Sequence, residues 1–112
     1  TGLEPALSAV AFDGPEETLR RTLYTQPAIL AASLAAYRCF SVRLPDCAPA
    51  AVAGHSLGEY GALFAAGAID VDRAARLVAR RAQLMETAPA GAMAAVLGLS
   101  GDAVRAVLGG MS

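Results

Sequence analysis

Apolar residues recur along most of the chain at the spacing of α-helices, and two short runs are apolar throughout. A turn at residues 13–17 leads into a short helix that reaches Leu23. Longer helical patterns follow over residues 25–40, 57–66, 70–86 and 102–108. The pattern therefore predicts a series of helices that each bury an apolar face.

Local signals place the ends of these helices. Pro27 fits the first turn of its helix, where proline's missing N–H is not needed, and Gly67 is expected to close a helix in a left-handed turn. Polar side chains that can accept a hydrogen bond from a free backbone N–H are the expected N-caps. They are Thr25, Asp70 or Asp72, and Ser100.

The two continuous apolar runs, residues 49–53 and 92–99, are predicted to be buried strands. Strands in alternation with helices indicate an α/β fold. Two strands are too few to make a sheet that covers so many apolar helices. We therefore expect further strands from a longer protein.

The first apolar run ends in the motif Gly54-His55-Ser56-Leu57-Gly58, directly before a helical pattern. This order of strand, G-x-S-x-G and helix is typical of a nucleophile elbow, a tight turn that leaves the serine hydroxyl projecting. Because the turn brings the backbone close to neighbouring elements, a Cβ at either glycine is expected to collide. Ser56 is therefore a candidate nucleophile.

A serine nucleophile needs a base within hydrogen-bond reach and donors for the oxyanion that its attack creates. The backbone N–H of Leu57, at the start of a helix, is expected to supply one such donor. His55 is the single histidine, but as the neighbour of Ser56 its side chain should leave the turn in another direction. A role in packing or hydrogen bonding is favoured for His55, and the chain is expected to lack a complete pair of nucleophile and base.

Composition excludes several classes of partner. The 112 residues are 55% hydrophobic, which is ample for a core, and the 9 basic and 10 acidic residues give a net charge of −1. No basic field is present to hold nucleic acid or anionic lipid. The longest nearly apolar stretch, residues 28–37, is too short to span a membrane, and no export signal is visible. A cytoplasmic location without nucleic-acid or membrane partners is expected.

Cys39 and Cys47 lack the spacing of metal ligands, and His55 fits no zinc pattern. No metal site is therefore predicted, and the two cysteines are interpreted as buried or incidental thiols.

Four blocks in order resemble the malonyl-CoA:acyl carrier protein transacylase family, which includes free-standing enzymes of fatty-acid synthesis and the acyltransferase domains of polyketide synthases. The blocks are Thr25-Gln26-Pro27-Ala28, Gly54-His55-Ser56-Leu57-Gly58-Glu59-Tyr60, Leu77 to Met85, and Gly91 to Leu99. The resemblance runs from about Thr25 to the end of the chain.

The resemblance implies a hydrolase-like parallel sheet with flanking helices, present here in part. Residues 1–87 would belong to the large α/β subdomain, and residues 88–112 would begin a small ferredoxin-like subdomain. The family's glycine- and glutamine-rich segment, which completes the oxyanion hole, and its catalytic histidine have no match in these residues. We therefore expect the chain to be an interior piece of the domain, inactive alone, whose partners include the remainder of that domain.

The resemblance also assigns residues to roles. The acyl-accepting serine falls on Ser56, an oxyanion-hole amide on Leu57, and the malonyl-binding arginine on Arg81, 25 positions after the serine. A guanidinium suits a malonyl carboxylate because it can donate two parallel hydrogen bonds. Periodicity alone leaves open that Arg81 is merely solvated, yet its place among the apolar helix positions favours a role in the site. Gln26 either contacts substrate directly or supports the helix start.

The activity implied is ping-pong transfer of a malonyl group from malonyl-CoA to Ser56 and on to the phosphopantetheine thiol of an acyl carrier protein. No bound cofactor is expected. Leu57 in the variable position of the elbow resembles malonyl-selecting members, because methylmalonyl-selecting domains often carry glutamine there. Two alternatives stay open, namely an α/β serine hydrolase or thioesterase, and a fragment without catalysis that serves structure or carrier-protein docking.

Overall fold

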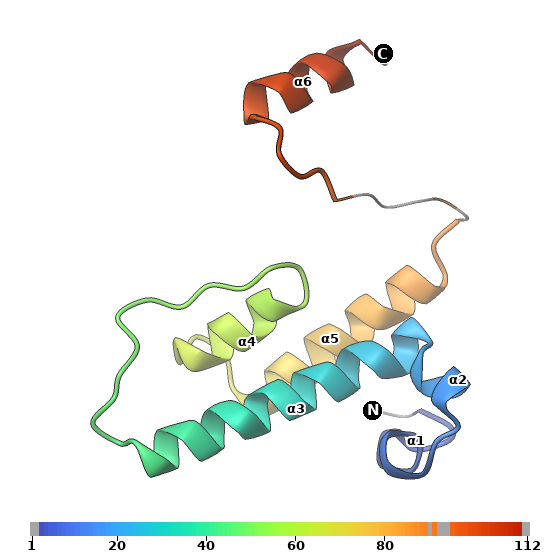
Figure 1. Cartoon of the computed structure of the whole chain (residues 1–112). Helices are drawn as coiled ribbons and strands as arrows, with labels where there is room; N and C mark the ends of the chain where they lie inside the picture. Colours follow the sequence, from blue (N-terminus) through green and yellow to red (C-terminus); the bar gives the residue numbers. More distant parts are fainter. Residues whose placement is uncertain (1–2, 90, 92–94, 111–112) are drawn as a thin grey trace.

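The structure is a computed structural model that describes residues 3–89, 91 and 95–110, and within these ranges every regular element is an α-helix (Figure 1). The helices are α1 (Leu7–Asp13), α2 (Glu16–Leu19), α3 (Thr22–Arg43), α4 (Gly58–Ala65), α5 (Val71–Glu86) and α6 (Gly101–Gly109).

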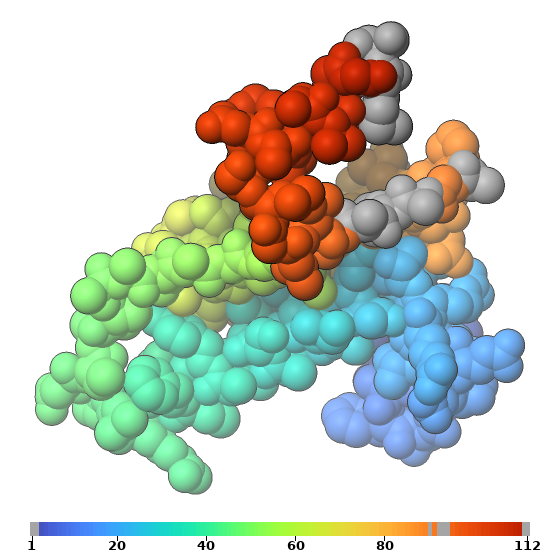
Figure 2. Space-filling model, turned by 45° about the horizontal axis from the view of Figure 1, so that its top comes forward, coloured from blue at the N-terminus to red at the C-terminus, as the bar shows by residue number. Residues whose placement is uncertain are grey.

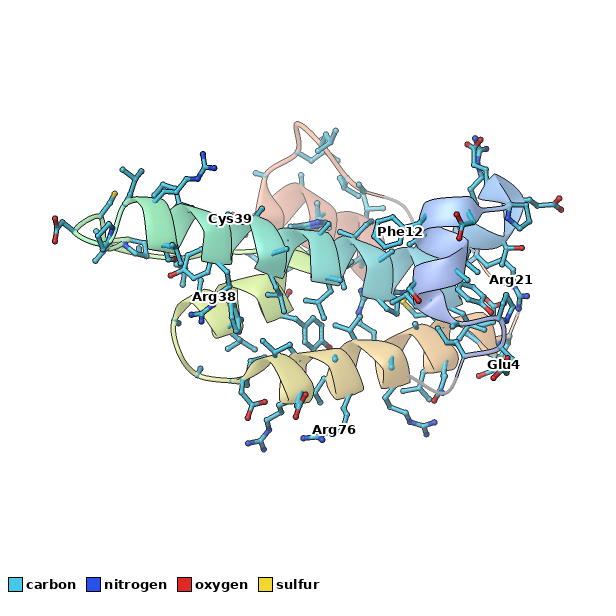
Figure 3. All side chains as sticks on the ribbon, turned by 90° about the horizontal axis from the view of Figure 1, so that it is seen from below. Glu4, Phe12, Arg21, Arg38, Cys39 and Arg76 are labelled. Carbon is cyan, nitrogen blue, oxygen red and sulfur yellow. The ribbon has the colours of Figure 1, made fainter. Side chains whose placement is uncertain are left out.

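The core lies between α3 and α5, which run side by side in opposite directions (Figures 1 and 3). Leu30 and Leu34 of α3 are buried against Ala74 and Val78 of α5. These four positions follow the i, i+4 spacing that puts apolar side chains on one helix face. The apolar stripes predicted from the sequence are therefore the surfaces that join the two longest helices.

An ion pair joins the N-terminal end of α3 to the C-terminal end of α5. The Arg21 guanidinium, directly before α3, donates to a Glu86 carboxylate oxygen at 2.7 Å, at the last residue of α5. Glu86 raises the pKa of Arg21, first through this hydrogen bond and then through its charge. Because the pair is open to solvent, its contribution to stability is small.

Helix α4 packs across the middle of this helix pair. Leu57, Tyr60 and Phe64 lie against the core cluster. The Phe64 ring meets that of Tyr37 edge to face, with 6.0 Å between ring centroids, and the Tyr37 hydroxyl donates to the Ala65 carbonyl at 3.3 Å. Helix α4 is thereby held against α3.

Most of the predicted helix ends are confirmed. The Asp70 carboxylate accepts a hydrogen bond from the Arg73 N–H at 2.7 Å, and the Ser100 hydroxyl accepts one from the Ala103 N–H at 3.2 Å. Gly67, which follows the C-cap residue of α4, adopts a φ of 71°, as a closing glycine requires. These signals are local, because each depends on residues only a few positions apart in the chain.

The beginning of the chain differs from the prediction. Helix α3 begins at Thr22 rather than after Thr25, because the Arg21 carbonyl already accepts the first helical hydrogen bonds. The Thr25 hydroxyl instead donates to the Leu19 carbonyl at 2.5 Å. Helix α1 was not predicted, since its mixed polarity hides the one residue that it buries fully, Val10.

The predicted α/β fold is wrong for the part of the chain that the structure describes. Residues 49–53 are irregular and exposed, and so are residues 95–97 and 99 of the second predicted strand; residues 92–94 of that strand lie outside the described residues. A strand exists only when its backbone groups pair with another strand, and apolar character alone does not supply that partner. The parallel sheet and the ferredoxin-like subdomain are therefore not found, and the described fold is helical.

In the part of the chain that the structure describes, α6 makes no contact with α1 to α5, and it stands apart from them in Figure 1. In the space-filling view, α1 and α2 gather at one end of α3 and residues 44–50 at the other (Figure 2). The contacts between helices in the described ranges are therefore those among α1 to α5.

Candidate active site

Ser56 lies on a strained turn between the irregular segment 51–54 and α4. Its φ is 55°, the one positive value among non-glycine residues in the described ranges. The Gly58 N–H donates to the His55 carbonyl at 2.9 Å and closes the turn. Such a conformation costs about 1–3 kcal/mol and persists only where surrounding contacts enforce it. The exposed Ser56 side chain is thus presented at a sharp bend, as an elbow requires.

The two glycines of the motif differ in whether the structure has room for a side chain. A Cβ added at Gly54 would lie 2.1 Å from both the carbonyl carbon and the oxygen of Gly58, so only glycine fits there. A Cβ at Gly58 would meet nothing within 4 Å. The predicted collision is confirmed for Gly54 and wrong for Gly58. A Cβ at Gly54 would point at the backbone of Gly58, whereas a Cβ at Gly58 would point into open space.

Arg81 reaches Ser56 from α5. Its Nη2 donates a hydrogen bond to the Ser56 Oγ at 2.7 Å, although the two residues are 25 positions apart. Arg81 is half-buried, whereas Arg73, Arg76 and Arg80 on the same helix are exposed. Figure 3 shows Arg76 pointing away from α3 and α4. Arg81 is therefore the arginine of α5 whose side chain meets the elbow.

No carboxylate balances the charge of Arg81 within the described residues. The ion pairs found there hold Arg20, Arg21 and Arg105. Arg81 has the neutral Ser56 hydroxyl and the neutral Gln26 amide as its hydrogen-bond partners. A half-buried guanidinium beside a serine thus presents a positive charge that an anionic group could meet.

Gln26 lies behind Arg81 as the one buried polar side chain of the described residues, 6% exposed. Its Oε1 accepts a hydrogen bond from Arg81 Nη1. Its Nε2 donates to the Thr22 Oγ1 at 2.5 Å and contacts the Met85 Sδ at 3.2 Å. Gln26 therefore contacts the guanidinium rather than the serine.

Sequence reasoning did not select Thr22 or Met85. A signal was available, because Thr22 precedes Gln26 by four residues and Met85 follows Arg81 by four, which places each pair on one helix face. What the spacing could not show is that the two faces meet.

His55 and Leu57 flank the serine. Both line an apolar groove of about 660 Å³ between α3, the segment 51–53 and α4, a groove that Ser56 itself does not line. The Ser56 hydroxyl is hydrogen-bonded to Arg81 and not to the imidazole. Leu57 is the N-cap residue of α4, so its N–H precedes the hydrogen bonds of that helix. The prediction that this N–H serves an oxyanion stays a prediction.

The structure also bears on the cysteines, on metal binding and on membrane spans. Cys39 and Cys47 are both exposed free thiols, which contradicts burial and agrees with the other interpretation, that they are incidental thiols. Within residues 3–89, 91 and 95–110 no three histidine, cysteine, aspartate or glutamate side chains gather as a metal site would need. None of the helices there combines the length and the apolar character of a membrane span.

Comparison with known proteins places the chain in a family. Residues 4–107 match the family model described as the acyl transferase domain. The chain belongs to the acyl transferase family. The resemblance of its four sequence blocks to the malonyl-CoA:acyl carrier protein transacylases is thereby confirmed.

Several relatives of this acyl transferase chain are closely similar. The malonyl CoA-acyl carrier protein transacylase of Haemophilus influenzae is 48% identical over 81% of the chain and 30% of the relative. The protein of the same name from Escherichia coli strain K12 is 50% identical over 83% of the chain and 31% of the relative. The polyketide biosynthesis protein ThaF of Burkholderia thailandensis is 48% identical over 91% of the chain and 9% of the relative.

The acyl transferase chain thus spans just under a third of these two transacylases, and less of the polyketide protein. No solved structure matches it.

Proposed function

We propose that the protein carrying this chain transfers a malonyl group from malonyl-CoA to the phosphopantetheine thiol of an acyl carrier protein, through an ester on Ser56. The observation that supports this most is the hydrogen bond from Arg81 to the serine hydroxyl, made by a guanidinium with no carboxylate partner in the described residues. The names of the relatives from Haemophilus influenzae and Escherichia coli support the same substrate and acceptor.

In the first half-reaction, Ser56 Oγ attacks the thioester carbonyl of malonyl-CoA and its proton passes to a general base. The tetrahedral oxyanion accepts a hydrogen bond from the Leu57 N–H at the start of α4. Collapse breaks the carbon–sulfur bond, and the leaving CoA thiolate takes up the proton from the base. The carrier's thiol then attacks the malonyl ester by the reverse path, which forms a new thioester and returns the hydroxyl.

Arg81 binds the free carboxylate of the malonyl group in this scheme. Gln26 occupies Nη1, whereas Nη2 lies on the side of Ser56, next to any acyl group attached to that oxygen. A charge-assisted hydrogen bond from this side of the guanidinium would hold the carboxylate while the ester forms and breaks. An acetyl group carries no such carboxylate, so Arg81 would select malonyl over acetyl.

The general base is not His55 in this proposal. His55 is the neighbouring residue and lines the groove beside α3, while the Ser56 hydroxyl meets Arg81. We assign the base to another residue of the full-length protein. We also propose that residues 1–87 and 88–112 belong to different subdomains, which is supported by the lack of contact between α6 and the other described helices.

The test replaces Arg81 with alanine in the full-length protein and measures loading by intact mass, with malonyl-, methylmalonyl- and acetyl-CoA offered separately. Loss of this charge-assisted hydrogen bond should lower kcat/KM for malonyl loading roughly 10- to 100-fold and leave acetyl loading nearly unchanged. Arg76→Ala, on the exposed side of the same helix, is the matched control. Equal losses for malonyl and acetyl in Arg81→Ala would remove the carboxylate-binding role.

The same measurement separates transfer from hydrolysis. A transferase should keep a malonyl adduct on Ser56 until carrier protein is added, and should prefer malonyl over methylmalonyl. A wild-type adduct that disappears in water alone would instead support the serine hydrolase or thioesterase alternative.

A further inference from the structure

We propose that Thr22 is a positioning residue that holds the Gln26 amide in the one orientation able to bind Arg81. The inference rests on the proposed function, because it concerns how Arg81 is kept ready for a carboxylate. Thr22 lies at the first position of α3, one turn before Gln26.

The contacts form a continuous chain across two helices. Thr22 Oγ1 accepts a hydrogen bond from Gln26 Nε2 at 2.5 Å. The other end of the same amide, Oε1, accepts from Arg81 Nη1, and Arg81 Nη2 donates to Ser56 Oγ at 2.7 Å. Thr22 therefore acts on the serine site through two side chains and without touching it.

The direction of these hydrogen bonds follows from the chemistry of the groups. An arginine offers donors and no acceptor, so the amide atom that faces Arg81 has to be the oxygen. The NH₂ group of Gln26 must then find its acceptor on the opposite side, where Thr22 supplies a hydroxyl oxygen. The reversed amide would place its NH₂ group against the guanidinium, donor against donor. Its oxygen would then face the Thr22 hydroxyl and could no longer accept from Arg81.

Burial makes this orientation costly to lose. Gln26 is 6% exposed, so water cannot readily replace a missing partner. Its other neighbour on the NH₂ side, the Met85 sulfur at 3.2 Å, is a weak acceptor. Every buried polar side-chain atom in the described residues has a partner, and for the Gln26 amide the strong acceptor is Thr22.

The experiment compares Thr22→Val with Thr25→Val in the full-length protein. Both threonines are half-buried on α3. Each substitution by valine removes one hydroxyl and keeps a side chain of nearly the same shape. The Thr25 hydroxyl donates to the Leu19 carbonyl and takes no part in the chain to Arg81. Thr22→Ser keeps a hydroxyl at the position and serves as the rescue variant.

The readout is the ratio of kcat/KM for malonyl loading to kcat/KM for acetyl loading, with thermal melting measured alongside. We expect Thr22→Val to lower this ratio roughly five- to tenfold, mainly through a higher KM for malonyl-CoA, which corresponds to one buried hydrogen bond. Thr22→Ser should restore most of the ratio, and Thr25→Val should leave it at the wild-type value even where it lowers the melting temperature.

The outcomes distinguish this inference from the function on which it rests. Wild-type protein that forms no malonyl adduct on Ser56 overturns both. If the wild-type protein loads malonyl and Thr22→Val leaves the malonyl-to-acetyl ratio of kcat/KM unchanged, the positioning role alone is overturned. The same holds if Thr22→Val lowers malonyl and acetyl loading equally, to the extent seen in Thr25→Val. If Thr22→Val does not fold, Thr22→Ser and Thr22→Ala decide, because the inference requires the serine variant to keep the ratio and the alanine variant to lower it.

Discussion

Replacing Gly54 with alanine tests whether the close approach of two backbones shapes the serine turn. The added Cβ would lie 2.1 Å from the Gly58 carbonyl carbon and oxygen and 2.4 Å from the Glu59 nitrogen. All three atoms are backbone, so no side chain can rotate away to make room. Either α4 must shift as a unit or the turn at Ser56 must open.

The size of the conflict sets the expected effect. The nearest contacts are about 1.3 Å shorter than ordinary van der Waals contact, which begins at 3.4 Å. Overpacking of buried positions typically costs about 1–3 kcal/mol, and contact with immovable backbone should reach the upper end of that range or exceed it. In a domain of about 150–250 residues, 3 kcal/mol lowers the melting temperature by roughly 6 °C or more.

Activity should suffer more than stability. A misplacement of about 1 Å between reacting groups can cost about 100-fold in rate. Movement of the turn that carries Ser56 should therefore lower malonyl loading at least about tenfold in protein that is still folded at the assay temperature. Intact-mass loading assays and thermal melts on the full-length protein measure both quantities.

Gly58→Ala is the matched control, because it adds the same methyl group to the other glycine of the motif. Nothing lies within 4 Å of that Cβ, so the melting temperature should stay the same or rise slightly as the alanine restricts the unfolded chain. The reasoning would be refuted by a Gly54→Ala protein that melts and loads like Gly58→Ala.

Two further predictions concern the guanidinium network and the helix that carries it. Gln26→Glu should lower malonyl loading about tenfold with little change in acetyl loading, because a carboxylate beside Arg81 competes with the substrate for the N–H groups of Arg81. An unchanged ratio of the malonyl and acetyl loading rates would contradict this. Asp70→Ala should destabilise the protein by about 1 kcal/mol through loss of the cap on the Arg73 N–H, whereas Asp70→Asn should not. Urea unfolding measures the difference, and equal stability of the two variants would refute the capping role.

Comparison of expectation and structure shows which features are local. The caps at Asp70 and Ser100 and the closing glycine at position 67 were predicted correctly, since each depends on a few neighbouring residues. The start of α3 was misplaced because Thr25 has two possible partners, and only the position of the Leu19 carbonyl shows which one it takes.

The errors in fold class have one cause. Residues 49–53 and 92–99 have the apolar character of buried strands, but a strand also needs backbone partners, and none pairs with the described parts of either segment. Hydrophobicity indicates that a segment is suited to burial and does not indicate what buries it. The same limit explains why Val96 and Leu97, predicted to be buried, are more than half exposed.

The order of amino acids is enough to indicate an elbow at Ser56, because the glycines, the serine and the helix that follows are adjacent in the chain. It is also enough, through the resemblance to transacylases, to single out Arg81. That the two side chains meet, and that Gln26 and Thr22 stand behind the guanidinium, follows from the packing of α3 against α5. Contacts between residues that are 25 to 55 positions apart depend on how whole helix faces fit together, and no local pattern encodes that fit.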